Sequence, residues 1–171
     1  MTLKNLWSLQ VGEVICADLI KRHLGEDYEI FIPLNNQLKD YDLVVMNQKT
    51  KKVSKIQVKE SREYNLGMGD GWFNVSKDKV KNKVTDFYIF LIYTAEEDKN
   101  KMKMVTYPLI VPSDVLLIKS EGKIARKGKY DYYFKIKKEH AYEDRDNREF
   151  PIDYSPYVNN FNLLKWTNLI T

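Results

Sequence analysis

The hydrophobic positions of the first 24 residues recur at the three-to-four-residue spacing of an amphipathic helix, and Gly25 follows as a stop signal. This pattern predicts a long first helix over residues 4–24. Alternating or short apolar runs bounded by turn residues predict strands over residues 28–34, 41–46, 53–59, 87–93 and 104–111. A later alternating segment, residues 129–137, predicts a strand or hairpin arm.

Punctuating residues fill in the remaining elements. Ser76 is a good N-cap for a short helix, and Pro112-Ser113-Asp114 begins another short helix that extends to Ile118. The glycine-rich residues 64–71 and the polar residues 95–101 and 139–150 predict loops, and residues 162–170 predict a short closing helix. The mixture of helices and strands is typical of an α/β protein.

Composition narrows the classes of protein. With 171 residues, of which 43% are hydrophobic and 13% aromatic, the chain fits a single domain over residues 1–171 with a packed core. No stretch approaches the roughly 20 apolar residues of a membrane helix, and the N-terminus lacks the regions of a signal peptide. The single Cys16 cannot form an internal disulfide, nor a zinc cluster with only two histidines. We therefore expect a cytoplasmic protein without membrane contact.

The charge is informative through its distribution. A net charge of +4 does not by itself identify a nucleic-acid binder. Basic residues concentrate in residues 49–59, 77–83 and 119–129, and they form a phosphate track only if the fold brings them onto one surface. The glycine-rich stretch lacks the Gly-Lys-Ser/Thr ending of a P-loop, so no nucleotide cofactor is expected.

Glu13 is unusual because its neighbours on the predicted helix, at positions 9, 16, 17 and 20, are Leu, Cys, Ala and Ile. A carboxylate on this apolar face is costly unless it is paired, hydrogen-bonded or bound to a metal. The alternative is an edge residue that reaches water beside Gly12.

A second group of polar residues lies on the predicted strands. The two-residue period of a strand sends Gln57 and Lys59 to one face and their apolar neighbours to the other. Asp42 opens the preceding strand, and a hairpin between the two strands places its carboxylate near Gln57. The alternative is the ordinary solvent-facing side of a hairpin.

The order of these residues is more specific than each residue alone: a helical Glu13, then Asp42 before a strand, then Gln57-Val58-Lys59 on the partner strand. This order resembles the PD-(D/E)xK nuclease superfamily. The glutamine form of the half-motif is similar to that of Mrr-type restriction enzymes, and the order also resembles small Holliday junction resolvases. Tyr41 stands where the family name has proline, and Gln57 replaces an acidic ligand.

The resemblance implies a restriction-endonuclease-like fold, in which a mixed central β-sheet is flanked by α-helices. The core would extend over about residues 1–118, and residues 119–171 would add a hairpin, a charged loop and the closing helix. It also implies Mg²⁺ or Mn²⁺ held by Asp42, Gln57, Glu13 and the backbone carbonyl of Val58. Lys59 completes the catalytic set, and the activity implied is that of a DNA endonuclease, which we expect to act as a homodimer.

Three residues are candidate DNA contacts: Ser61 and Arg62, which directly follow the half-motif, and Lys77 near the start of the short helix. Each is also compatible with an ordinary solvated surface residue. Two other functions stay open. The chain is either a nuclease, a nucleic-acid-binding module that kept the fold and lost catalysis, or an interaction protein whose polar hairpin imitates the motif.

Overall fold

The computed structural model describes residues 11–33, 40–64, 69–98, 101–137, 139–146 and 148–165, with the backbone alone at 95–98 and 101–104. The predicted helical residues 4–10 lie outside these ranges, as does Asn35-Asn36, a dipeptide typical of a turn. The helices are α1 (Val11–Leu24), α2 (Lys77–Lys81) and α3 (Ser113–Lys119), followed by the 3-10 helices η1 (Ser155–Tyr157) and η2 (Phe161–Lys165). The strands are β1 (Tyr28–Phe31), β2 (Leu43–Asn47), β3 (Val53–Arg62), β4 (Asp70–Ser76), β5 (Phe87–Asp98), β6 (Lys101–Pro112), β7 (Lys129–Lys137), β8 (His140–Glu143) and β9 (Ile152–Asp153).

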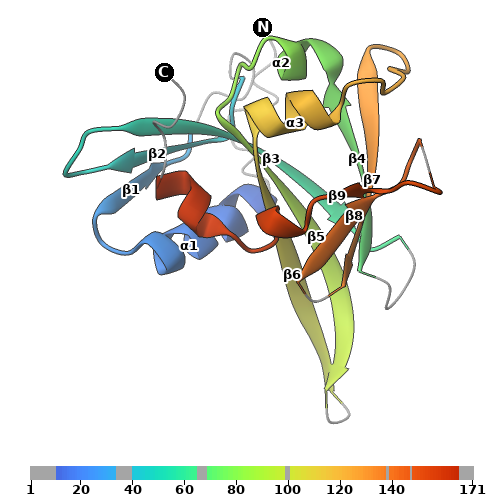
Figure 1. Ribbon diagram of the computed structural model, residues 1–171. Helices are drawn as coiled ribbons and strands as arrows, with labels where there is room; N and C mark the ends of the chain where they lie inside the picture. Colours follow the sequence, from blue (N-terminus) through green and yellow to red (C-terminus); the bar gives the residue numbers. More distant parts are fainter. Residues whose placement is uncertain are drawn as a thin grey trace, which may run out of the picture.

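The first sheet has five strands in the order β1-β2-β3-β5-β6 and is mixed, as predicted. Strands β1, β2 and β3 form an antiparallel meander, β5 is parallel to β3, and β6 is antiparallel to β5. Helix α1 covers one face of this sheet, where its Cys16 and Ile20 pack with Ile56 and Val58 of β3 (Figure 1). The predicted combination of a mixed sheet with an amphipathic first helix is confirmed.

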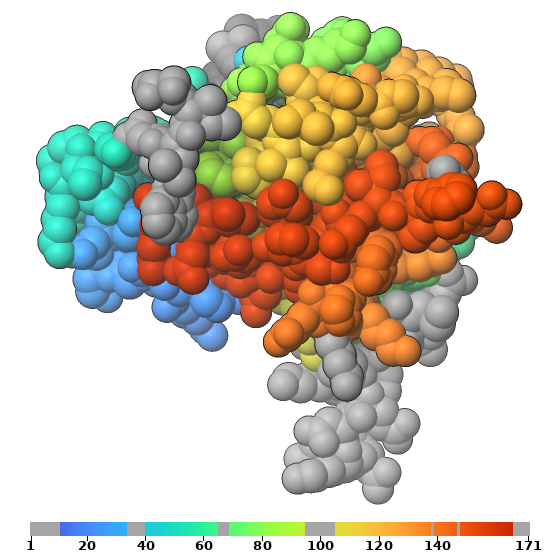
Figure 2. All heavy atoms as spheres, viewed as in Figure 1, coloured from blue at the N-terminus to red at the C-terminus, as the bar shows by residue number. Residues whose placement is uncertain are grey.

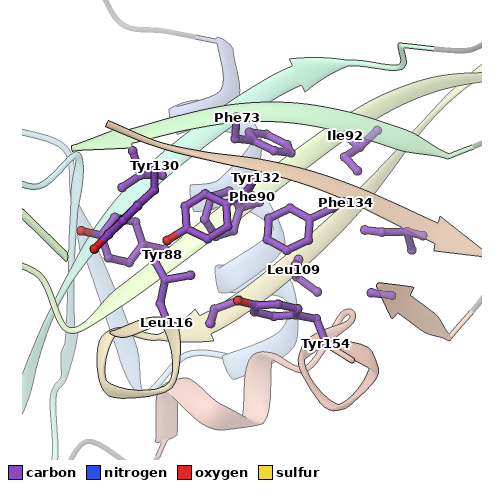
Figure 3. Packing of buried hydrophobic residues seen from close by; sticks show 14 of the residues in the cluster. Phe73, Tyr88, Phe90, Ile92, Leu109, Leu116, Tyr130, Tyr132, Phe134 and Tyr154 are labelled. Atoms are coloured by element: carbon purple, nitrogen blue, oxygen red, sulfur yellow. The ribbon is translucent and has the colours of Figure 1, made fainter. Parts of the chain in front are cut away.

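The other face of the first sheet is covered mainly by a second sheet, in the order β4-β7-β8-β9, and Val80 of α2 and Leu116 of α3 pack into the same core. Alternate residues of β7 point inward, so that Tyr132 and Phe134 pack against Phe90 of β5 (Figure 3). Helices α2 and α3 lie together at one end of the molecule (Figure 1). The chain is therefore an α/β protein made mostly of strands, and the picture of a sheet flanked by helices holds for one face only.

The C-terminal residues close the structure. In Figure 2 the last described segment, in red, crosses the visible face between α1 in blue and α3 in yellow. Phe161 of η2 stacks on His23 of α1 with 4.2 Å between the ring centroids. Where a closing helix was predicted over residues 162–170, the structure has the 3-10 helix η2, and the rest of that range lies outside the described residues.

Several predicted loops contain strands. Residues 139–150 include β8, in which Ala141 and Glu143 are buried and the outward residues are polar. Glu143 is tolerated there because Lys123 donates to it at 2.9 Å, so its charge did not mark a loop. Asp70 and Gly71 begin β4, and the predicted loop at residues 95–101 is mostly occupied by the ends of β5 and β6. None of the helices described is long and apolar enough to span a membrane.

Candidate functional site

The candidate site lies where β2 stops short of β3. The described register pairs Leu43, the first residue of β2, with Ile56, whereas β3 continues to Arg62. Asp42 occupies the position beyond the end of β2: its N–H donates to the Ile56 carbonyl at 2.8 Å, and its Oδ2 accepts the Val58 N–H at 2.7 Å. The carboxylate thus satisfies a backbone donor that the shorter neighbouring strand leaves exposed.

Gln57 brings a second polar group to this edge. Its side chain is buried, with 6% exposure, and its Nε2 donates to Asp42 Oδ2 and, more weakly at 3.5 Å, towards the Val58 carbonyl. The carboxylate of Asp42, the amide of Gln57 and the carbonyl of Val58 therefore gather around one point. The predicted hairpin between the two strands implied this proximity of Asp42 to Gln57.

The donor set fits a hard divalent cation. A half-turn of the Gln57 amide exchanges its nitrogen for its oxygen, and the N/O assignment of an amide follows from its hydrogen-bond network. Oxygen would then face Asp42 Oδ2 and the Val58 carbonyl, and Mg²⁺ binds such oxygens while retaining several waters. Among the residues that the structure describes, no group of three or more His, Cys, Asp or Glu could hold a metal. A cation here would depend on the amide and the backbone carbonyl.

Lys59 lies on the same face of β3 as Gln57 and is half-buried. Its neighbour in the register with β5 is Phe90. Burial lowers the pKa of its ammonium group below the ordinary value. The negative charge of Asp42, and to a smaller extent that of Glu13, opposes this shift, whereas the positive charges of Lys79 and Lys129 reinforce it. The lysine can therefore release its proton more easily than an exposed lysine.

Glu13 is buried in α1, with 3% exposure, so the alternative of an edge residue reaching water is wrong. Its charge acts on Lys59. Burial first, and then Asp42, Glu60 and Glu13, also raise the pKa of the Cys16 thiol, which lies one helical turn after Glu13. Glu13 shares the buried stripe of α1 with Cys16 and Ile20, which pack on the Ile56 and Val58 face of β3, whereas Gln57 and Lys59 point to the other face.

One acidic residue near the site, Glu60, was not predicted from the sequence. Glu60 follows Lys59 on β3, and its Oε2 accepts a hydrogen bond from the Tyr93 hydroxyl at 2.8 Å. A Cβ atom on Gly12 would collide with that oxygen, so the start of α1 approaches β3 closely at Glu60. Strand alternation puts Glu60 on the same face as Ile56 and Val58, and a carboxylate on this apolar face was the available signal.

The predicted DNA contacts lie on different surfaces. Ser61 is on the Lys59 face of β3, and its Oγ accepts the Trp72 N–H of β4 at 3.3 Å. Arg62 is exposed and, as the next residue along the strand, faces the opposite side of the sheet. Lys77 begins α2, and its N–H donates to the Gly128 carbonyl at 3.0 Å.

That last contact brings together two of the three basic segments of the chain. Helix α2 lies beside the turn that precedes β7, so Lys79 and Lys129 both come near enough to Lys59 to lower its pKa. Lys79 also forms an ion pair with Asp40 at 3.3 Å, two residues before Asp42. Lys79 and Lys129, one from each of these segments, therefore lie near the site together, a proximity that the sequence alone could not establish.

Comparisons with protein-family models, with curated proteins and with solved structures gave no match to this chain.

Proposed function

We propose that this protein is a metal-dependent endodeoxyribonuclease that hydrolyses phosphodiester bonds in DNA, of restriction or junction-resolving type, with a restriction-endonuclease-like core. The observation that carries the proposal is the gathering of the Asp42 carboxylate, the Gln57 amide and the Val58 carbonyl at the open edge of β3. Beside them, on the same face as Gln57, lies a lysine whose pKa is lowered by burial. These groups match the needs of phosphodiester hydrolysis.

A bound Mg²⁺ or Mn²⁺ supplies neutralisation of the phosphate charge and a more acidic water. Asp42, the Gln57 carbonyl oxygen and the Val58 carbonyl would hold it, and Glu13 would contact it through water. Lys59 orients the attacking water and, in its neutral form, accepts a proton from it, a role typically worth a factor of about 10²–10⁴ in rate. In its protonated form the same ammonium stabilises the charge that develops on the phosphate.

The basic surface formed by α2 and the turn before β7 supports DNA as the substrate. Lys79 and Lys129 lie near enough to Lys59 to act on its charge, and Lys77 begins the same helix as Lys79. Lysines of this kind bind the phosphate backbone without reading its sequence. Because one site of this size cuts one strand, we infer that a homodimer acts on both strands of a duplex. A reducing cytoplasm suits the buried free Cys16.

A second candidate function is a binding module that has lost catalysis. The observation that favours it is the Gln57 amide nitrogen hydrogen-bonded to Asp42, which satisfies the carboxylate without any metal. Such a module would bind DNA in a salt-dependent manner and leave it intact.

Cleavage of supercoiled plasmid and of a four-way DNA junction in Mg²⁺, Mn²⁺ or EDTA separates the two functions. We expect cutting in Mg²⁺ or Mn²⁺ that is lost in EDTA and in both Asp42→Ala and Lys59→Ala. Lys49→Ala is the matched control, because Lys49 is an exposed lysine in the turn between β2 and β3 that pairs only at the surface with Asp27. Intact substrates in every metal, together with salt-sensitive binding, would replace the nuclease by the binding module.

A further inference from the structure

A cavity lies near the far end of β3, away from Asp42. It has a volume of about 470 Å³, within the range of small-ligand sites. Its walls combine three aromatic and three basic side chains: Tyr64, Trp72, Tyr133, Lys135, Arg145 and Arg148. Trp72 and Tyr133 are cross-strand partners on the outward face of β4 and β7, and Tyr64 follows β3. Neither the half-motif nor its chemistry accounts for this cavity.

The three rings form one cluster. The centroid of Trp72 lies 5.8 Å from that of Tyr133, and the centroid of Tyr64 lies 6.2 Å from each of them. A buried residue holds the cluster together, because Asp70 accepts the Tyr64 N–H at 3.0 Å and the Tyr133 hydroxyl. Asp70 itself is only 1% exposed. The fold therefore holds the Tyr133 ring and the backbone of Tyr64 in place, and it leaves the Tyr64 ring exposed.

The charges of the cavity identify the class of ligand. Arg145 stacks on Trp72 at 4.9 Å, and Lys135 lies over the Tyr133 ring at 5.5 Å. Asp144 is the acidic residue lining the cavity and already pairs with Lys135 at 2.6 Å. A quaternary ammonium ligand would be repelled by the remaining cations. An anion carrying a flat aromatic ring, which is the description of a nucleotide, satisfies both the rings and the charges.

Arg145 adds an independent observation. Its Nε is buried and has no hydrogen-bond partner among the residues that the structure describes. Buried donors are almost always satisfied, and a ligand acceptor is one explanation for a donor that is not. The edge of a nucleobase or a phosphate oxygen provides such an acceptor.

The cavity is close enough to the candidate catalytic site for one DNA strand to reach both. Tyr64 is five residues beyond Lys59, roughly 16 Å at the rise of an extended chain. Trp72 is tied directly to β3 through its N–H bond to Ser61, two residues after Lys59. A nucleobase stacked between the rings of Tyr64 and Trp72 needs about 7 Å between these two rings, whereas their centroids are 6.2 Å apart. Tyr64, the most exposed of the three aromatic residues at 68%, therefore has to move slightly outward when the base binds.

We propose that this aromatic and basic cavity binds an unpaired nucleobase of the DNA substrate, with Arg145 and Arg148 contacting the base edge and the adjoining phosphate. The inference rests on the proposed nuclease function, and it narrows the substrate to DNA with an unpaired nucleotide near the cut, as in a bulge or a flap. Uninterrupted duplex keeps its bases stacked and cannot fill the cavity without losing pairing.

The test is DNA binding in EDTA, where no cleavage occurs. The probes are two duplexes of equal length, one fully paired and one with a single unpaired 2-aminopurine, whose fluorescence falls when it stacks. We expect the second duplex to bind about 5- to 150-fold more tightly and to be quenched, from the value of one base–aromatic stack. Trp72→Ala and Tyr64→Ala should each abolish most of this preference, and Trp72→Phe should restore most of it.

Equal affinity for the two duplexes, or a preference that survives both alanine variants, would overturn the proposal. The proposal would also be overturned, in favour of a free-nucleotide site, if free deoxyadenosine monophosphate quenched the tryptophan fluorescence of wild type, but not that of Trp72→Phe, at the concentration at which the bulged duplex acts. The nuclease proposal fails separately. If plasmid and junction stay intact in Mg²⁺ while the preference for an unpaired base persists, the proposed base-binding role of the cavity is kept and the proposed nuclease activity is rejected.

Discussion

Lys59 provides a test in which stability and activity should change in opposite directions. Replacing it with methionine removes the ammonium group and keeps an unbranched side chain of similar length in the half-buried position on β3. Burial lowers the pKa of this lysine despite the attraction of Asp42 and Glu13, so the charged form is less favourable in the folded protein than in the unfolded chain. Removing the charge should therefore stabilise the fold.

We expect Lys59→Met to raise the free energy of unfolding at pH 7 by about 1 kcal/mol, the usual gain from relieving an unfavourable functional group. In a chain of this length this corresponds to a rise of roughly 2–4 °C in Tm. Lys59→Met should also abolish DNA cleavage. Lys49→Met is the control, since Lys49 is exposed, and it should leave both quantities nearly unchanged.

The pH dependence distinguishes this cause from a simple packing gain. The folded-state pKa of Lys59 lies below the unfolded value of 10.5, so the unfolded chain binds more protons between these two values. Wild type should therefore gain stability as the pH rises through that window, and the advantage of Lys59→Met should shrink towards its upper end. Urea unfolding of both proteins at neutral and alkaline pH measures this difference. A Lys59→Met protein less stable than wild type at pH 7, or an advantage independent of pH, would refute the reasoning.

Two further predictions concern the core and the basic surface. The Tyr154 hydroxyl is buried without a hydrogen-bond partner among the described residues, so Tyr154→Phe should stabilise the protein by about 1 kcal/mol in urea unfolding. Tyr132→Phe should instead destabilise it by about 1 kcal/mol, because it removes the 2.7 Å bond to Ser120, and the opposite ranking would contradict this account. If Lys129 contacts a phosphate, Lys129→Ala should weaken DNA binding and reduce the slope of log affinity against log salt by about 1, whereas an unchanged slope would remove it from the interface.

The elements that position the site could be predicted because their signals are local. The helical period around Glu13 and the alternation of Gln57 and Lys59 depend on residues a few positions away, and both patterns hold in the structure. The proximity of Asp42 to Gln57 followed from a short hairpin whose register is set by its apolar face.

The second sheet could be predicted only in part, because the alternation of residues 129–137 predicted β7 but not its partner strands. Strand β8 contains the buried Glu143, whose charge is compensated by Lys123 from a distant segment, and β4 begins in a glycine-rich stretch that resembles a loop. The aromatic and basic cavity likewise depends on pairing between β4 and β7, which joins Trp72 to Tyr133 over about sixty residues of chain. Contacts of such long range leave no periodic pattern in the sequence.

The most direct test of the central claim is the Mg²⁺ concentration that gives half-maximal DNA cleavage, measured for wild type, Gln57→Glu and Asp42→Ala. If Asp42 and Gln57 hold the ion, the extra carboxylate of Gln57→Glu should lower the Mg²⁺ requirement, and Asp42→Ala should not cut at any concentration tested. A requirement that is the same in wild type and Gln57→Glu, or cleavage that persists in Asp42→Ala, would contradict the proposed metal site.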